Sequence, residues 1–137
     1  MFRLSVADRI AKLCLSRPPV NAISEEWVLR FSEILDDLTA RPGWSVLHLT
    51  SDQKVFCAGA DLAEIRAHVD APGGPDRMYA FVAGIQRLFQ RIDQLPQVTI
   101  AEIGGAAMGG GLELALACDL RIAAATSRSD CPKRSSD

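Results

Sequence analysis

The residues best suited to chemistry in this chain of 137 residues lie in a glycine-rich stretch, Ile103–Asp119. A short apolar run rich in β-branched residues, Val98–Ile103, precedes the glycines and predicts a buried strand. The run Leu112–Ala117 after the glycines predicts a helix that carries one carboxylate, Glu113. Consecutive glycines let a backbone approach a ligand closely, and the first N–H groups of a helix point at whatever lies there. This junction therefore favours an anion, or an oxygen that becomes negative during a reaction.

A phosphate is the first ligand to consider at such a junction. Gly104 and Gly109 have the spacing of the two P-loop glycines. However, Gly110 and Gly111 stand where that motif requires Lys and then Ser or Thr, and the dinucleotide pattern Gly-x-Gly-x-x-Gly is also missing. The remaining candidate ligand is a carbonyl oxygen that gains charge during a reaction. Glu113, about one helical turn away, could then act as an acid or a base. The alternative is a packing turn before a core helix whose glutamate faces solvent.

A second strand-to-helix junction lies at Val55–Glu64. The expected strand ends in small residues around Gly59, and Asp61 can cap a helix that begins at Leu62. This junction offers a second set of backbone N–H donors.

Composition bounds the class of protein. With 48% apolar and 23% charged residues and a net charge of −2, the chain is typical of one globular domain. This composition argues against a nucleic-acid surface or a polybasic membrane patch. No apolar run has the length of a membrane span, and the first residues are not those of a signal peptide. We therefore expect a cytoplasmic protein with neither nucleic-acid nor membrane partners.

The cysteines and histidines indicate neither a disulfide frame nor a metal site. The cysteines are widely scattered without a Cys-x-x-Cys pair, which favours reduced thiols. They are Cys14, Cys57, Cys118 and Cys131. His48 and His68 stand alone in the sequence, and His48, inside an expected strand, is interpreted as structural.

Hydrophobic periodicity predicts the other elements. The expected strands are Phe2–Val6, Ile10–Leu15, Ser45–Thr50 and Val98–Ile103, and the expected helices are Ser24–Ala40, one from Leu62, Met78–Ile92 and Leu112–Ala117. The prolines of Arg17–Ala22 exclude a helix there and predict an ordered surface loop, whereas Ala71–Pro75 predicts a mobile one. With a last strand after Leu112–Ala117, the order β-β-α-β-α-α-β-α-β indicates a layered α/β fold.

Two motifs together resemble the crotonase family, the enoyl-CoA hydratases and isomerases. They are Phe56–Leu62 and, later in the chain, Gly109–Ala115 with Cys118-Asp119; the loop Arg17–Ala22 is also similar. The resemblance covers Phe2 to about Ser127, about the first half of a usual member. It implies a repeated ββα spiral whose C-terminal part is missing, with residues 1–127 as the N-terminal core and residues 128–137 as a tail unlike the family.

The resemblance also implies roles for individual residues. Ala60 and Gly110 match the two N–H donors of an oxyanion hole that holds a thioester oxygen while an enolate forms. Glu113 matches the first of two catalytic glutamates, and among its leucine neighbours it would be partly desolvated, which raises a carboxyl pKa. Further positions that match the binding site for coenzyme A and substrate are Val20, Ala22, Ala58, Asp61 and Leu62.

The expected partners follow from the same resemblance. The substrate is an acyl-CoA thioester, so coenzyme A is part of the substrate and neither a separate cofactor nor a metal is expected. A full-length relative is expected to form a homotrimer or a dimer of trimers.

The sequence departs from the family at the second glutamate, which hydratases carry in a Gly-x-Pro-Glu segment shortly after the first. The corresponding region here is Arg128–Asp137. A one-base frame shift near Ser129 is one hypothesis, because an alternative reading of possible codons restores Gly-Leu-Pro-Glu; a natural polar tail is the other. The leading interpretation is a hydratase of 2-trans-enoyl-CoA that is inactive as this truncated chain. The alternatives are an isomerase or another one-carboxylate crotonase, and a non-catalytic remnant that binds coenzyme A.

Overall fold

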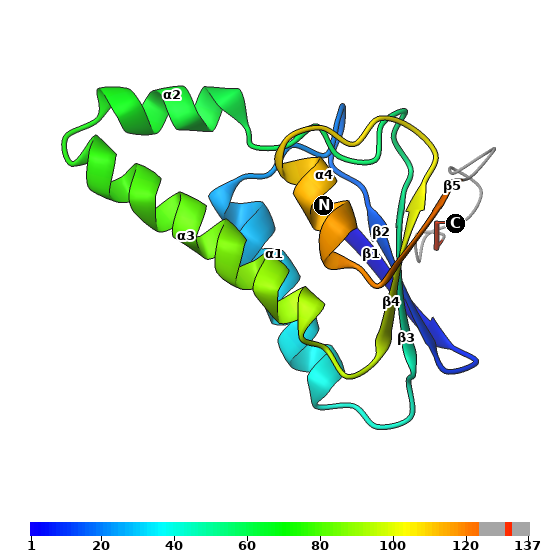
Figure 1. Cartoon of the computed structure of the whole chain (residues 1–137). Coiled ribbons are helices and arrows are strands. Elements are labelled where there is room, and N and C mark those ends of the chain that lie inside the picture. Colours follow the sequence, from blue (N-terminus) through cyan, green and yellow to red (C-terminus); the bar gives the residue numbers. More distant parts are fainter. Residues whose placement is uncertain (124–130, 133–137) are drawn as a thin grey trace.

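A five-stranded sheet lies on one side of the molecule and the helices on the other (Figure 1). The computed structural model describes residues 1–123 and 131–132. The strands are β1 (Phe2–Ala7), β2 (Ile10–Leu15), β3 (Val46–Ser51), β4 (Val98–Ile103) and β5 (Leu120–Ala123), and the helices are α1 (Glu25–Thr39), α2 (Leu62–Asp70), α3 (Gly74–Asp93) and α4 (Gly110–Ala117). The expected order of elements and the α/β class are confirmed, and the expected tail, 128–137, lies outside the described residues except for Cys131 and Pro132.

The strands follow one another across the sheet in chain order. β1 and β2 form an antiparallel hairpin, and its two turn residues, Asp8 and Arg9, have the positive φ angles of a tight hairpin turn. All other neighbouring strands are parallel. Because parallel strands point the same way, the loops that leave β2, β3 and β4 emerge at one edge of the sheet.

Helix α1 begins and ends where the sequence predicts. Ser24 is its N-cap, accepting a hydrogen bond from the Trp27 N–H at 3.1 Å, and Ala40 is its C-cap. Its apolar stripe is fully buried and packs in the core, as the periodicity requires; the stripe is Trp27, Phe31, Leu35 and Leu38.

The expected mobile loop Ala71–Pro75 is wrong in extent, because α3 already begins at Gly74. Pro75 stands in the first turn of α3, where its missing N–H would have no helical partner in any case. The helices α2 and α3 are therefore joined by a short turn in which Gly73 takes a left-handed φ of +72°. None of the helices in the described ranges is both long and apolar enough to span a membrane.

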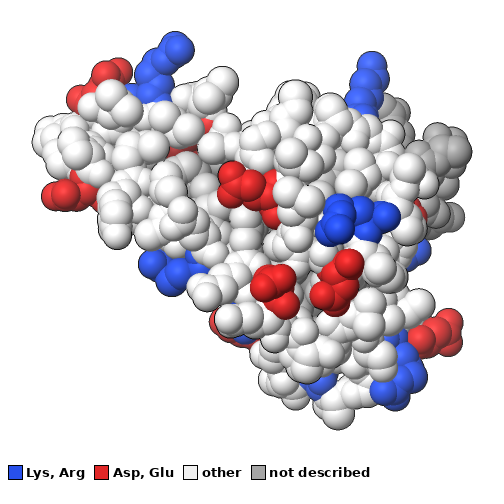
Figure 2. All heavy atoms as spheres, viewed as in Figure 1, with Lys and Arg blue, Asp and Glu red and all other residues white. Residues whose placement is uncertain are grey.

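The C-terminal elements expose apolar side chains. Leu112 and Leu116 of α4 are 47% and 57% exposed, and Leu120 and Ile122 of the edge strand β5 are similarly open. Figure 2 shows acidic and basic groups interspersed on one face, with wide uncharged areas between them. The described part of the chain therefore leaves these apolar side chains open.

Candidate active site

The two strand-to-helix junctions lie side by side and are joined through their backbones. The Phe56 N–H donates to the Ala106 carbonyl at 2.8 Å, and the Met108 N–H donates to the Cys57 carbonyl at 3.0 Å. Cys57 and Ala107 form an isolated parallel bridge. The loops after β3 and β4 thus form one surface at the carboxyl edge of the sheet.

Glycines make this close approach possible. A Cβ on Gly111 would lie 2.0 Å from the Cys57 carbonyl oxygen, and one on Gly59 would lie 3.0 Å from that of Met108. Gly59 also takes a φ of +96°, a conformation that side chains disfavour. Glycine at these two positions therefore sets the distance between the junctions.

The N–H groups of Ala60 and Gly110, the expected oxyanion donors, come from these adjacent segments. A Cβ on Gly110 would lie 3.9 Å from the Ala60 nitrogen. Ala60 pairs with Ile23 in a parallel bridge. In this bridge the Ile23 N–H donates to the Gly59 carbonyl and the Asp61 N–H donates to the Ile23 carbonyl, so the Ala60 N–H takes no part. Within residues 1–123 no hydrogen bond uses the N–H of Ala60 or of Gly110, so both remain available to a ligand.

A hollow of about 560 Å³ lies at this surface. It is lined by Val20, Ala22, Ala58, Gly59, Ala60, Asp61, Leu62, Ala63, Gly109 and Gly110. All seven residues expected to bind substrate and coenzyme A are among them. The sequence interpretation did not name Gly59, Ala63 and Gly109 as lining residues, although Gly59 and Gly109 lie within the two motifs and Ala63 directly follows the first.

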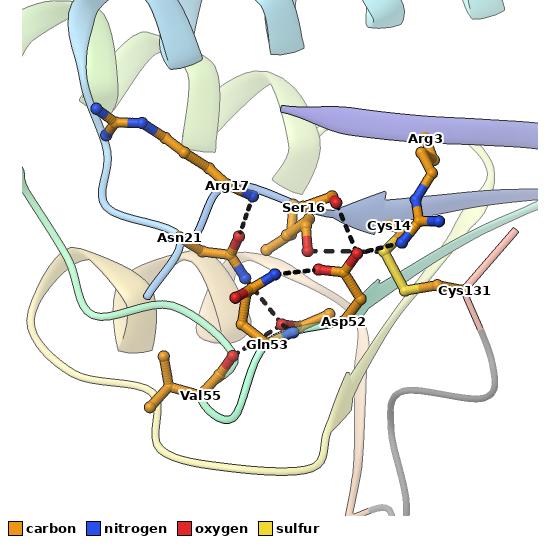
Figure 3. A network of polar contacts seen from close by, with 11 residues as sticks. Arg3, Cys14, Ser16, Arg17, Asn21, Asp52, Gln53, Val55 and Cys131 are labelled. Carbon is orange, nitrogen blue, oxygen red and sulfur yellow. Dashed lines mark hydrogen bonds and ion pairs between the residues drawn. A yellow bond between two sulfur atoms is a disulfide. The ribbon is translucent and has the colours of Figure 1, made fainter. Parts of the chain in front are cut away.

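Asn21 holds the third loop, Arg17–Ala22, against the end of β3 and the loop that follows it. It is fully buried, and its side-chain amide donates to Ser51 Oγ at 2.8 Å and to the Phe56 carbonyl at 2.9 Å. Its Oδ1 accepts from the Arg17 N–H at 2.8 Å (Figure 3). The position has a φ of +54°, which asparagine tolerates better than most residues. Sequence reasoning predicted an ordered loop but missed this residue.

Asp61 is occupied by structural contacts at the rim of the hollow. Its Oδ1 accepts from the N–H groups of Ala63 and Glu64, capping α2, and its Oδ2 lies 2.9 Å from the Arg17 guanidinium. Burial raises the pKa of this carboxyl, but the backbone hydrogen bonds and the Arg17 charge outweigh it and hold the pKa below its usual value. Asp61 therefore shapes the site as a carboxylate.

A second polar network ties β2 to the loop after β3. The Asp52 carboxylate accepts hydrogen bonds from Ser16 Oγ and Gln53 Nε2, both at 2.6 Å, and pairs with Arg3 (Figure 3). Burial opposes ionisation, but these contacts lower the pKa of Asp52 overall.

The expectation of four reduced thiols is wrong for Cys14 and Cys131, which form a disulfide with Cα atoms 5.3 Å apart (Figure 3). The two residues are 117 positions apart, so no sequence spacing could reveal the pair. Cys57 and Cys118 are free and buried. Burial raises the pKa of the Cys57 thiol to about 11, so this cysteine at the junction is protonated near neutral pH and is a poor nucleophile.

Glu113, the expected acid or base, lies in the first turn of α4, three residues after Gly110, but its side chain is exposed. The expected desolvation among leucines is therefore not found, because Leu112 and Leu116 are themselves exposed. In the part of the chain that the structure describes, Glu113 does not line the hollow. The structure thus brings the two N–H donors together and leaves the carboxylate on an open surface.

Neither histidine is isolated in the fold. His48 Nε2 lies 3.3 Å from the buried carboxylate of Glu102, which also accepts from Thr50 Oγ1. His68 is buried and lies 2.7 Å from Glu25 Oε1.

Solved structures define the class of fold to which this architecture belongs. A crystal structure of enoyl-CoA hydratase from Bacillus anthracis superposes with a TM-score of 0.80 at 33% identity, over 92% of this chain and 48% of the other. The crotonase-like α/β fold is thereby confirmed.

The chain belongs to the enoyl-CoA hydratase/isomerase family, whose model matches residues 6–133. Enoyl-CoA hydratase domain-containing protein 2 of Bos taurus is 42% identical over 85% of this chain and 38% of its own length. An enoyl-CoA isomerase/hydratase of Mycosarcoma maydis is 39% identical over 83% of this chain and 43% of its own. The chain therefore spans less than half the length of these relatives.

Proposed function

We propose that this chain carries the oxyanion-stabilising part of a hydratase site that adds water to 2-trans-enoyl-CoA thioesters. The proposal rests on the adjacent, uncommitted N–H groups of Ala60 and Gly110 at a hollow of about 560 Å³. A thioester carbonyl oxygen placed there accepts two hydrogen bonds. The oxygen gains charge as the reaction proceeds, so the fixed donors stabilise the transition state more than the ground state.

The reaction is a conjugate addition. A water oxygen bonds to the β-carbon, and the electron pair of the carbon–carbon double bond moves toward the thioester to give an enolate. The water loses one proton to a carboxylate, and the α-carbon then takes up a proton. One oxyanion-hole donor contributes about 3–4 kcal/mol in comparable sites.

Glu113 is the carboxylate assigned to this proton transfer. It follows Gly110 by three residues on the same helix, which places it within one turn of a proposed donor. Its exposure fits a site whose remaining wall comes from another segment or another chain, since the chain spans under half of its relatives. With one carboxylate, the chain by itself is expected to hydrate substrate poorly or not at all.

The second candidate is a reaction that needs one carboxylate, such as moving the double bond of a 3-enoyl-CoA. Glu113 is the one carboxylate that the family motif assigns here, and the Mycosarcoma maydis relative is named as both isomerase and hydratase. The third candidate is a non-catalytic chain that binds coenzyme A.

Equilibrium dialysis with acetoacetyl-CoA, beside assays with 2-trans-butenoyl-CoA and a 3-enoyl-CoA, separates the three. Hydration that Glu113→Gln abolishes supports the hydratase, and double-bond migration alone supports the isomerase. Binding without turnover supports the non-catalytic chain. Failure to bind acetoacetyl-CoA contradicts all three.

A homotrimer or a dimer of trimers is the assembly proposed for a full-length relative, and this chain is expected to associate unless another chain covers its apolar surfaces. The exposed leucines of α4 and the open edge strand β5 support it, because such surfaces are usually covered by another element or chain. Analytical ultracentrifugation of the chain tests it, and a monodisperse monomer would contradict it.

A further inference from the structure

Three side chains from helices α1 and α2 lie close together outside the hollow. Glu25 is the first residue of α1, and Glu64 and His68 lie one turn apart on α2. One ligand atom from each lies within 4.8 Å of the other two. The Glu25 N–H also donates to both Glu64 carboxylate oxygens, at 3.2 and 3.1 Å, so the two helices are already in contact here.

The imidazole of His68 is buried and faces both carboxylates. The residue is 5% exposed, and the centre of its ring lies 6.0 Å from that of the Phe81 ring. Nε2 lies 2.7 Å from Glu25 Oε1 and 3.8 Å from Glu64 Oε1. Among the described residues, this nitrogen nevertheless makes no hydrogen bond of acceptable geometry. His68 Nε2 is thus buried near two carboxylate oxygens but makes no hydrogen bond to either. Such an arrangement suits a cation that the nitrogen and both carboxylates bind together.

The donor set and its spacing fit zinc. Zinc takes His nitrogen and Glu oxygen ligands at about 2.1 Å in tetrahedral geometry, which places neighbouring ligand atoms about 3.4 Å apart. The observed separations of 2.7 and 3.8 Å lie on either side of that value. Glu64 and His68 are four residues apart on one helix, so both point to the same side.

We infer that Glu25, Glu64 and His68 form a binding site for Zn²⁺, with solvent in the fourth position. The site lies outside the hollow, and the inference is independent of the proposed function. The ion ties α2 to the start of α1. Helix α2 follows directly on Ala60 and Asp61, which line the hollow. By holding α2, the bound ion would therefore also fix one rim of the hollow. The opposing explanation is a plain ion-pair cluster in which Arg77, 3.8 Å from Glu25 Oε1, supplies the positive charge.

Titration of the metal-free full chain with ZnCl₂, followed by calorimetry and thermal melting, tests the site. We expect one equivalent of zinc to bind and the Tm to rise by about 5 °C or more at a large excess over the Kd. MgCl₂ at the same concentration is expected to leave the Tm unchanged, because an imidazole-containing set favours transition metals over magnesium.

Two variants test the ligands, Glu25→Gln and Glu64→Gln. Each replaces one ligand carboxylate by an uncharged amide of the same size, and each is expected to weaken zinc binding at least about tenfold. Glu26→Gln is the matched control: it makes the same change one residue away, on an exposed side chain, and should bind zinc like the wild type. Zinc affinity that is equal in all three variants, no binding by the wild type, or an equal response to magnesium would overturn the inference.

Discussion

The α-carbon of Gly111 lies so close to the carbonyl of Cys57 that a Cβ would stand 2.0 Å from that oxygen. Gly111 belongs to the first turn of α4, and Cys57 lies in the loop after β3, so this contact joins the two halves of the candidate site. Gly110, one of the two proposed donors, is the neighbour of Gly111 in that turn.

Gly111→Ala is expected to destabilise the fold although alanine is the better helix former. The added methyl group meets a backbone oxygen that cannot rotate away, and such overpacking costs about 1–3 kcal/mol or more. The free energy of unfolding in urea measures the change. Gly84→Ala is the matched control, because Gly84 lies inside α3 and its Cβ would meet nothing closer than two side-chain atoms at 3.9 Å. That variant should gain about 0.5–1 kcal/mol; a Gly111→Ala variant that behaves like it would refute the steric argument.

Local sequence signals were sufficient for most of the fold. Ser24 and Asp61 sit at their helix N-caps because their side-chain oxygens satisfy free N–H groups, which depends only on near neighbours. The spacing of Trp27, Phe31 and Leu35 likewise fixes which face of α1 is buried. Most of the lining of the hollow was predictable because the two family motifs and the similar loop Arg17–Ala22 carry it.

The errors share a different cause. Each missed contact joins residues that are distant in sequence. These contacts are the Cys14–Cys131 disulfide, the pairing of His68 with Glu25, and the hydrogen bonds of Asn21 to Ser51 and Phe56. Their partners depend on the packing of whole elements, which periodicity does not specify. The exposure of Glu113 has the same origin, since the burial of a helix face depends on what packs against it.

The ionised Asp52 carboxylate is expected to stabilise the fold above its unfolded-state pKa. The pKa of Asp52 is lower in the folded chain than its usual value of 3.8. The stabilisation is therefore complete at a pH well above 3.8, and it is lost as the pH falls through the pKa of the folded state. The unfolding free energy of the wild type should fall between about pH 5 and pH 3 more steeply than that of Asp52→Asn. At pH 7, Asp52→Asn is expected to cost about 1–3 kcal/mol because charged hydrogen bonds are lost. Equal slopes for the two proteins would contradict the assignment.

The Cys14–Cys131 disulfide is expected to stabilise the chain by closing a long loop. Denatured protein without reductant should show two reactive thiols out of four cysteines. A phosphine reductant should lower the unfolding free energy by about 2–4 kcal/mol, because it frees the unfolded chain. Cys131→Ser should match the reduced wild type and be insensitive to the reductant. Four reactive thiols in the untreated protein would show that the bond does not form.

Gly110→Pro is expected to remove one proposed oxyanion donor while leaving α4 in place. Gly110 is the first residue of α4 after its N-cap Gly109, a position at which proline is tolerated because its N–H has no helical partner. Gly110→Ala is the matched control, because it adds a Cβ near Ile23 Cδ1 but keeps the N–H. Relative to Gly110→Ala, Gly110→Pro should weaken binding of acetoacetyl-CoA, and any measurable kcat for hydration should fall about 100-fold or more. Unfolding curves establish that both variants fold. Equal kcat and equal affinity in the two folded variants would show that the Gly110 N–H does not contact the thioester oxygen.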